Sequence, residues 1–267
     1  MKTRRIADAH THIFPEKIAE KATFNIGEFY GIGMNAIGLA DKLIESGREI
    51  GVTRYLVCSV ATKESQVISI NDFIHAACQA HPEFLGFASL HPDLSRPEDE
   101  IERVYALGMR GIKFHPDFQL CNIDDEKLMP TYRKMAELGL PGLFHMGDDR
   151  YDFSAPVRLR RVKDRFPELT CIAAHFGGYQ VWDAAYRELD QVDGLYFDTS
   201  SSLFALSADQ AVKMIRHFGA DRFMFGTDFP MWQHQEELAR FEALPLTEEE
   251  RDQIFAGTFS ALFGVEV

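Results

Sequence analysis

Two histidines near the start of the chain have the spacing of a metal-binding pair. They are the third and fifth residues of the segment Asp-Ala-His-Thr-His, at positions 10 and 12. Alternate side chains of an extended strand project from the same face, so His10 and His12 could reach one cation. Further donors follow short apolar runs later in the chain, namely His145, His175 and Asp228. Together these residues predict a metal site.

The donor types indicate the chemistry. Zinc and similar divalent ions bind imidazole nitrogens at about 2.0–2.1 Å, and a catalytic site keeps one position open for water or substrate. His10, His12 and His145 would supply neutral nitrogens, and Asp228 would supply an anionic oxygen. A bound metal lowers the pKa of its water to about 7. The second oxygen of Asp228 could then accept the proton of that water.

The elements that must position these donors alternate between two kinds. Eight apolar runs predict strands at 6–9, 55–60, 84–90, 111–114, 142–144, 170–174, 195–197 and 223–225. Amphipathic segments predict helices at 65–79, 97–107, 126–138, 156–166, 179–189, 207–217, 235–241 and 248–256. This alternation is typical of α/β proteins with parallel strands.

A closed (β/α)8 TIM barrel explains the positions of the donors best. They follow the first, fifth, sixth and eighth predicted strands, and they converge only if the last strand lies beside the first. An open doubly wound sheet is the alternative, because alternation by itself does not distinguish the two. No linker or change in composition marks a boundary, so we expect a single domain over 1–267.

The connection after the first strand is unusually long and distorts the predicted barrel. Between Phe14 and Gly51 several aromatic residues are interspersed with Gly27, Gly31, Gly33 and Gly38. We expect a loop over the mouth of the barrel, followed by a helix over 39–48. A mobile lid with apolar contacts to substrate and an ordinary packed insertion are both open interpretations.

Composition excludes several classes of partner. Hydrophobic residues make up 46% of the chain and include 22 Phe, enough for a large core. A formal charge of −13 argues against nucleic acid as a partner. No apolar run approaches the roughly 20 residues that a transmembrane helix needs. The N-terminus lacks the apolar stretch of a secretory signal, so Arg4-Arg5 is not expected to direct export. Four separated cysteines fit a reducing cytoplasm.

Six ordered segments carry a resemblance to a known family. They are Asp-Ala-His-Thr-His, Gly-Ile-Lys-Phe-His-Pro, Phe-His-Met-Gly, Ala-Ala-His-Phe-Gly-Gly, Tyr-Phe-Asp-Thr-Ser and Phe-Gly-Thr-Asp-Phe-Pro. Over nearly the whole chain, this set resembles the amidohydrolase superfamily. More narrowly, it resembles the amidohydrolase-2 branch, which includes the aminocarboxymuconate-semialdehyde and resorcylate decarboxylases.

The resemblance implies the roles of the site residues. One divalent ion, Zn²⁺ first and Mn²⁺ second, would be held by His10, His12, His145 and Asp228. His175 would orient the metal-bound water or move a proton. A second ion held through His175 and a carbamate on Lys113 is the less favoured arrangement. The chain departs from the family at Met146, beside the fifth-strand histidine, and at Thr258-Phe259 near the C-terminus.

Other residues at strand ends are candidates for binding substrate. Lys113 is placed to bind a substrate anion, and His115 either lines the pocket or anchors a loop. Arg150 and Arg158 could bind a carboxylate, although arginines in loops are commonly solvated. Trp232 could form an apolar wall or pack internally. Asp198 either hydrogen-bonds a ligand histidine or caps the loop that follows it.

These expectations lead to one main function and two alternatives. The main prediction is a cytoplasmic, metal-dependent hydrolase of a small amide, lactone or ester, in which Asp228 and His175 are catalytic. A non-oxidative decarboxylase is the alternative enzyme, and an inactive metal-binding protein is the third interpretation. The expected partner is a small-molecule substrate, and a homodimer is a fold-level expectation.

Overall fold

The computed structural model describes residues 5–267, so Arg4 of the N-terminal segment lies outside the described residues. Eight strands form one sheet, and neighbours are hydrogen-bonded in the order β1 to β8. The strands are β1 (Ile6–His12), β2 (Val52–Cys58), β3 (Phe84–Ser89), β4 (Gly111–Phe114), β5 (Gly142–Phe144), β6 (Cys171–Ala173), β7 (Leu195–Asp198) and β8 (Phe223–Met224). The pairs from β3 to β7 are parallel.

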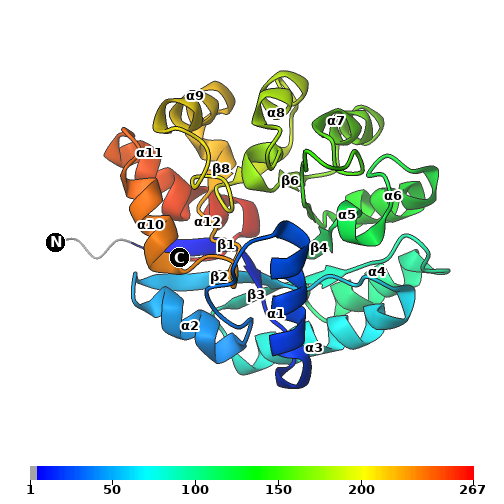
Figure 1. The fold of residues 1–267 in the computed structure, drawn as a ribbon. Coiled ribbons are helices and arrows are strands. Elements are labelled where there is room, and N and C mark those ends of the chain that lie inside the picture. The colour runs from blue at the N-terminus through cyan, green and yellow to red at the C-terminus, as the bar shows by residue number, and fades with distance from the viewer. Residues whose placement is uncertain (1–4) are drawn as a thin grey trace. The chain divides into compact units, whose positions relative to one another are not determined.

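Helices follow the strands in turn (Figure 1). They are α1 (Glu16–Tyr30), α2 (Ala40–Arg48), α3 (Val67–Ala80), α4 (Pro97–Ala106), α5 (Pro116–Gln119), α6 (Met129–Leu138), α7 (Pro156–Arg165), α8 (Trp182–Glu188), α9 (Ala208–Phe218), α10 (His234–Glu242), α11 (Glu248–Asp252) and α12 (Thr258–Phe263). Within the described part of the chain, no helix combines the length and the apolarity that crossing a bilayer requires.

The last strand pairs with the first, which distinguishes a barrel from an open sheet. The amide of Ala9 donates to the carbonyl of Phe225 at 2.8 Å, and the amide of Asp228 donates to the carbonyl of His10 at 2.8 Å. Thr11 forms a parallel bridge with Phe229. The fold is therefore the predicted (β/α)8 barrel, and the doubly wound alternative is excluded.

The chain divides into two compact units. The first contains the chain up to Val57 together with His81–Leu85 and Asp198–Val267, and the second contains Cys58–Ala80 and Gly86–Phe197. The first unit carries β1 and β8, and the second carries β4, β5 and β6. Every residue of these last three strands is buried, as expected for strands with apolar packing on both faces. The single domain over 1–267 stays a prediction.

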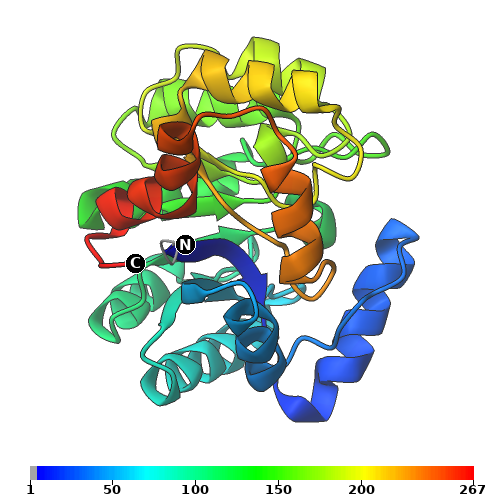
Figure 2. The same cartoon turned by 90° about the vertical axis from the view of Figure 1, so that its left-hand side faces the viewer.

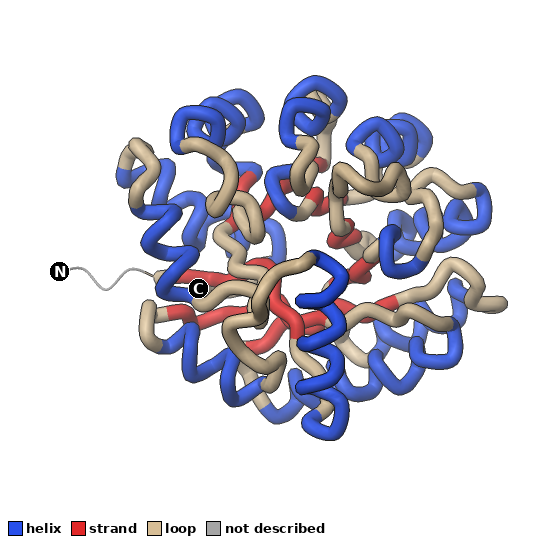
Figure 3. Tube along the Cα trace, viewed as in Figure 1, coloured by secondary structure: helices blue, strands red, loops and turns tan. Residues whose placement is uncertain are grey.

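The segment after β1 differs from the expected loop. Helix α1 occupies Glu16–Tyr30, where the sequence predicted a loop, and the expected second helix is α2. Figure 3 shows that most of this segment is helical, and Figure 2 shows α1 well separated from α11 and α12 in the same unit. The buried face of α1 consists of Ala19, Thr23 and Gly27, which are four residues apart. Because these buried residues are small, the segment shows no periodicity of large apolar side chains, and the sequence did not predict α1.

Candidate metal centre

Three predicted ligands come together in the first unit. Strand β1 presents His10 and His12, and Asp228 follows β8. Oδ1 of Asp228 lies 3.2 Å from Nε2 of His12 and 3.6 Å from Nε2 of His10. Donors at 2.0–2.1 Å from a tetrahedral ion are about 3.4 Å apart, so these distances match a shared cation. The three atoms form a group that could hold a metal.

The orientation of His10 is fixed by Asp198 at the end of β7. Nδ1 of His10 lies 2.9 Å from Oδ2 of Asp198, and both side chains are fully buried. A carboxylate only accepts hydrogen bonds, so the proton belongs on Nδ1 and the lone pair on Nε2 faces Asp228. Oδ1 of Asp198 also accepts from the amide of Ser200 at 3.1 Å and from its hydroxyl at 2.5 Å. Asp198 therefore both orients a predicted ligand and caps the loop.

A second buried carboxylate ties β1 to the loop that carries Asp228. Asp8 accepts from the amide of His10 at 3.1 Å, and its other oxygen accepts from the hydroxyl of Thr227 at 2.5 Å. Nε2 of His234 lies 3.0 Å from the same oxygen. Asp8, Thr227 and His234 have no exposed surface. These contacts hold Asp228 in a backbone conformation with a φ of +60°, which is uncommon for a residue other than glycine.

Close packing behind His10 depends on a glycine. A Cβ atom at Gly226 would lie 3.3 Å from the Cβ atoms of His10, Asp198 and Ser200. Cβ contacts at this distance are rare in folded proteins. The absence of a side chain at Gly226 therefore lets the imidazole and the carboxylate approach each other.

Two more predicted site residues meet in the second unit. His145 follows β5 and His175 follows β6, and Nδ1 of His145 lies 2.9 Å from Nε2 of His175. Nε2 of His145 lies 3.1 Å from the carbonyl oxygen of Gly147. A carbonyl only accepts, so the proton of His145 belongs on Nε2, and Nδ1 accepts from Nε2–H of His175. The one lone pair of the His145 ring is therefore on Nδ1, and in this structure it accepts from His175.

The backbone around His175 is strained. His175 has a φ of +60° and Phe176 a φ of +55°, a conformation that costs about 1–3 kcal/mol per residue. Nε1 of Trp182 donates to the carbonyl of His175 at 3.0 Å, and the amide of Gly178 donates to the same oxygen at 3.1 Å. These contacts hold the backbone at His175 in this conformation.

Asp117, which was not among the residues predicted from the sequence, lies beside His145. Oδ2 of Asp117 is 3.6 Å from Nε2 of His145 and accepts from the hydroxyl of Ser154 at 2.6 Å. Its Oδ1 is buried without a hydrogen-bond partner, and burial raises the pKa of the carboxyl to about 6. Asp117, His115 and His145 form a further group that could hold a cation. The carboxylate two residues after the strand-end His115 was the signal available in the sequence.

The predicted substrate residues differ in their surroundings. Lys113 is fully buried on β4. His115 stacks on Phe118 with 3.7 Å between ring centroids, and its Nδ1 accepts from the amide of Phe118 at 3.4 Å, which favours loop anchoring. Two nitrogens of Arg150 contact the carboxylate of Asp148 at 2.7 and 2.8 Å. Binding of substrate by these residues stays a prediction.

The remaining two candidates also have protein partners. Trp232 donates from Nε1 to the hydroxyl of Ser201 at 3.0 Å. Arg158 contacts the carboxylates of Asp124 at 2.7 Å and Asp152 at 2.5 Å. The contacts of Arg158 use polar atoms that would otherwise bind a carboxylate. The apolar wall predicted at Trp232 and the substrate role of Arg158 both stay predictions.

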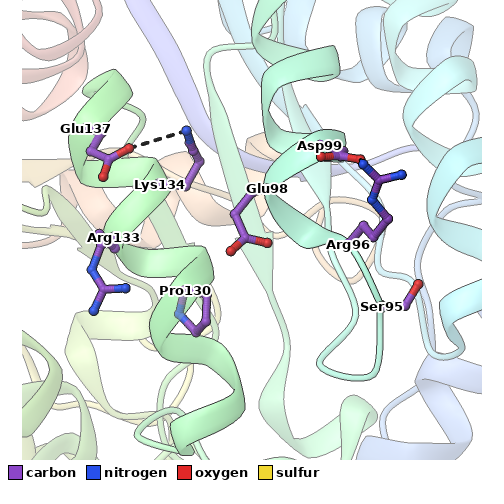
Figure 4. A pocket seen from close by; sticks show the side chains of 8 residues that line it. All are labelled: Ser95, Arg96, Glu98, Asp99, Pro130, Arg133, Lys134 and Glu137. Atoms are coloured by element: carbon purple, nitrogen blue, oxygen red, sulfur yellow. Dashed lines mark ion pairs between the residues drawn. The ribbon is translucent and has the colours of Figure 1, made fainter.

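A surface pocket lies between α4 and α6 of the second unit (Figure 4). Arg96 pairs with Asp99 on its α4 side. On α6, Lys134 contacts Glu137 at 3.3 Å and Glu102 at 3.0 Å. The lining contains as many acidic as basic side chains, so the pocket offers no excess charge for a ligand.

Comparison with known proteins gives a consistent result. The sequence model of the amidohydrolase family matches residues 7–265. A dihydroxybenzoic acid decarboxylase from Polaromonas sp. JS666, solved with bound manganese and 2-nitroresorcinol, superposes with a TM-score of 0.76 at 19% identity, covering 98% of this chain and 97% of that one. No curated protein matches the chain.

Two further structures are similar. The 5-carboxyvanillate decarboxylase of Sphingomonas paucimobilis gives a TM-score of 0.75 at 14% identity, covering 98% of this chain and 99% of that one. A candidate 2-pyrone-4,6-dicarboxylic acid hydrolase from Pseudomonas putida gives 0.70 at 18% identity, covering 98% of both chains. At these low identities, the TM-scores show the shared barrel fold alone.

Proposed function

This chain belongs to the amidohydrolase family, and on that premise we propose that it is a metal-dependent, non-oxidative decarboxylase of a small aromatic carboxylic acid. The sequence favoured hydrolysis and kept decarboxylation as the alternative. The comparisons support the alternative better, because two of the three similar structures described above are decarboxylases and one of them binds manganese.

The grouping of His10, His12 and Asp228 is the observation that carries the proposal. Two neutral nitrogens and one carboxylate oxygen are a donor set that both Zn²⁺ and Mn²⁺ accept. When bound, the ion supplies positive charge that attracts the substrate carboxylate and stabilises developing negative charge. His145 as a further ligand stays a prediction, and so does the choice between Zn²⁺ and Mn²⁺.

The reaction needs an acid as well as a cation. Breaking the bond between the ring carbon and the carboxylate releases carbon dioxide and leaves the electron pair on the carbon, which must then take one proton. We assign this proton to Nε2 of His175, which is buried and donates to His145 in the structure. The hydrogen bonds to the carbonyl of His175 restrain the backbone that carries this imidazole.

One contact weakens Asp228 as the base that hydrolysis needs. The hydrolytic mechanism predicted from the sequence needs an oxygen of Asp228 to accept a proton from water. Oδ1 faces His12, and Oδ2 accepts the proton of the Ser201 hydroxyl at 2.6 Å. The hydrogen bond occupies one lone pair of the oxygen that would serve as the base, and it stabilises the carboxylate as an anion.

Isotope labelling separates the two reactions. Enzyme loaded with Mn²⁺ or Zn²⁺ is given dihydroxybenzoates, 5-carboxyvanillate and 2-pyrone-4,6-dicarboxylate in D₂O and, separately, in H₂¹⁸O. Decarboxylation releases carbon dioxide and places one deuterium on the ring carbon that lost it. Hydrolysis instead places ¹⁸O in a new carboxylate of the product.

The variants assign the roles. We expect His10→Ala to lose bound metal and activity together. We expect His175→Asn to retain metal and to lower kcat by about 10²–10⁴-fold, the range for loss of a general acid. Incorporation of ¹⁸O without carbon dioxide would establish the hydrolase. Metal-loaded protein that converts none of these compounds would favour the inactive metal-binding protein.

A further inference from the structure

We propose that Trp232 and Ser201 form a positioning relay that fixes the carboxylate of Asp228 for metal binding. The relay consists of Nε1 of Trp232, the hydroxyl of Ser201 and Oδ2 of Asp228, all in the first unit. The inference rests on the proposed role of Asp228 as a ligand. It assigns a function to two side chains on loops that follow β7 and β8.

The direction of the hydrogen bonds in the relay is fixed by chemistry. An indole N–H can only donate, so Trp232 donates to the Ser201 oxygen at 3.0 Å. The single proton of the Ser201 hydroxyl is then directed to Oδ2 of Asp228 at 2.6 Å. Sδ of Met231 also lies 3.4 Å from the hydroxyl, but a thioether is a much weaker acceptor than a carboxylate.

The contacts at the Trp232 ring keep its N–H in place. Phe204 stacks on the ring with 5.1 Å between centroids, and the guanidinium of Arg240 lies 4.4 Å from the ring centroid. Arg240 in turn pairs with the buried Glu237. A ring held by a stacked phenyl and a cation presents its N–H in a defined direction. Protein groups already contact the ring surface, which is why we assign Trp232 a positioning role.

The backbone at both other members of the relay is in the left-handed region. Ser201 has a φ of +45° and Asp228 a φ of +60°. Residues other than glycine keep this conformation only where surrounding contacts hold it, and such residues concentrate at functional sites. The Ser201–Asp228 hydrogen bond joins the two strained positions directly.

The relay restricts the rotation of the Asp228 carboxylate. With Oδ2 held by Ser201, Oδ1 stays beside His12 and His10. Without the hydroxyl, the Asp228 carboxylate rotates in the metal-free protein. Metal binding must then stop this rotation, and the lost conformational entropy lowers the affinity. Loss of a hydrogen-bond partner behind a ligand weakens metal affinity by about 10–100-fold, and we expect a change of that size.

The test compares two variants that affect the backbone in opposite ways. Ser201→Ala removes the hydroxyl and keeps the strain, whereas Ser201→Gly removes the hydroxyl and relieves the strain. We expect both to weaken Mn²⁺ binding by about 10–100-fold in isothermal titration calorimetry, while Ser201→Gly unfolds at a higher urea concentration than Ser201→Ala. If Ser201 acted only by stabilising the fold, the more stable variant, Ser201→Gly, would also bind Mn²⁺ more tightly than Ser201→Ala.

A matched control lies in the same loop. Ser202 is fully buried and its hydroxyl donates to the carbonyl of Ser200 at 2.9 Å. We expect Ser202→Ala to bind Mn²⁺ within about threefold of the wild-type protein, because its hydroxyl bonds to the carbonyl of Ser200 and not to a predicted ligand. Weakening of Ser202→Ala equal to that of Ser201→Ala would overturn the relay.

Fluorescence gives a readout that reports the relay itself. The chain has two tryptophans, so in a Trp182→Phe background the emission comes from Trp232 alone. We expect saturating Mn²⁺ to change this emission, and we expect Ser201→Ala in the same background to abolish the change. Trp232→Phe keeps an aromatic ring without the N–H, and we expect it to weaken binding about threefold or more, because it removes a neutral hydrogen bond.

The two proposals fail in different ways. A wild-type protein with no affinity for Mn²⁺ or Zn²⁺ would overturn both the proposed function and the relay. A wild-type protein that binds metal, with both Ser201 variants binding it as tightly, would overturn the relay alone.

Discussion

Replacing Asp198 with asparagine tests how the orientation of His10 is fixed. In the native protein one oxygen accepts from Nδ1 of His10 at 2.9 Å, and the other accepts from the amide of Ser200 at 3.1 Å. An asparagine has only one acceptor oxygen. The amide of Ser200 can only donate, so the oxygen turns toward Ser200 and the NH₂ group faces Nδ1 of His10. His10 must then carry its proton on Nε2, the atom that faces Asp228.

The magnitude follows from the burial and charge of this pair. Both side chains are fully buried, and a hydrogen bond to a charged group contributes about 1.5–3 kcal/mol. Since each 1.4 kcal/mol is about tenfold in affinity, Asp198→Asn should weaken Mn²⁺ binding by about 10–100-fold. Before Nε2 of His10 can bind the ion, its proton must move to Nδ1, where no carboxylate accepts it. This change of tautomer releases no net proton, so the number of protons released on binding should stay as in the wild-type protein.

Isothermal titration calorimetry in two buffers of different ionisation enthalpy measures both the affinity and the proton release. Asp41→Asn, an exposed carboxylate on α2 of the same unit, is the matched control and should bind as the wild-type protein does. Urea unfolding checks that Asp198→Asn is folded. A folded Asp198→Asn protein whose Mn²⁺ affinity lies within threefold of wild type would refute the reasoning.

Three further predictions follow from the same unit. Mn²⁺ at about 100 times its dissociation constant should raise the free energy of unfolding by about 2.7 kcal/mol in urea titrations, and a chelator should reverse this; no shift would count against a folded-state site. Gly226→Ala should push apart His10 and Asp198 and weaken Mn²⁺ binding at least tenfold by calorimetry. An unchanged affinity would show that neighbouring residues shift to accommodate the methyl group. Burial, only partly offset by Arg240, raises the pKa of Glu237 to about 8 from an ordinary 4.5, so the folded protein keeps a proton that the unfolded chain loses. This group therefore favours folding fully below about pH 4.5, and its contribution is lost as the pH rises to about 8. Glu237→Gln cannot ionise, so its stability relative to wild type should increase from pH 5 to pH 8 in urea unfolding, and a constant difference would contradict the shift.

The segment after β1 shows where the sequence pattern misled. Apolar periodicity identifies a helix by the large side chains that it buries, and it worked for α4 and α9, whose buried faces contain Ile101, Val104 and Ile215. The buried face of α1 is made of small residues. The glycines in this segment then predicted a loop, although Gly31 ends the helix in a left-handed conformation.

The sequence by itself predicted the barrel and the grouping of the three donor residues of the first unit. Alternation of side chains along a strand places His10 and His12 on one face, and closure of the barrel places Asp228 beside them. These properties depend on local pattern and on strand order, both of which a single sequence carries.

Only the tertiary structure decided which atoms of those residues are available. Asp198 lies 188 residues from His10 in the chain, and Ser201 lies 27 residues from Asp228, yet each fixes its partner through one hydrogen bond. Such pairings depend on how loops after different strands turn, including the positive φ values at Ser201 and Asp228. No periodicity encodes these turns, because the conformation of each loop is set by contacts with residues distant in sequence.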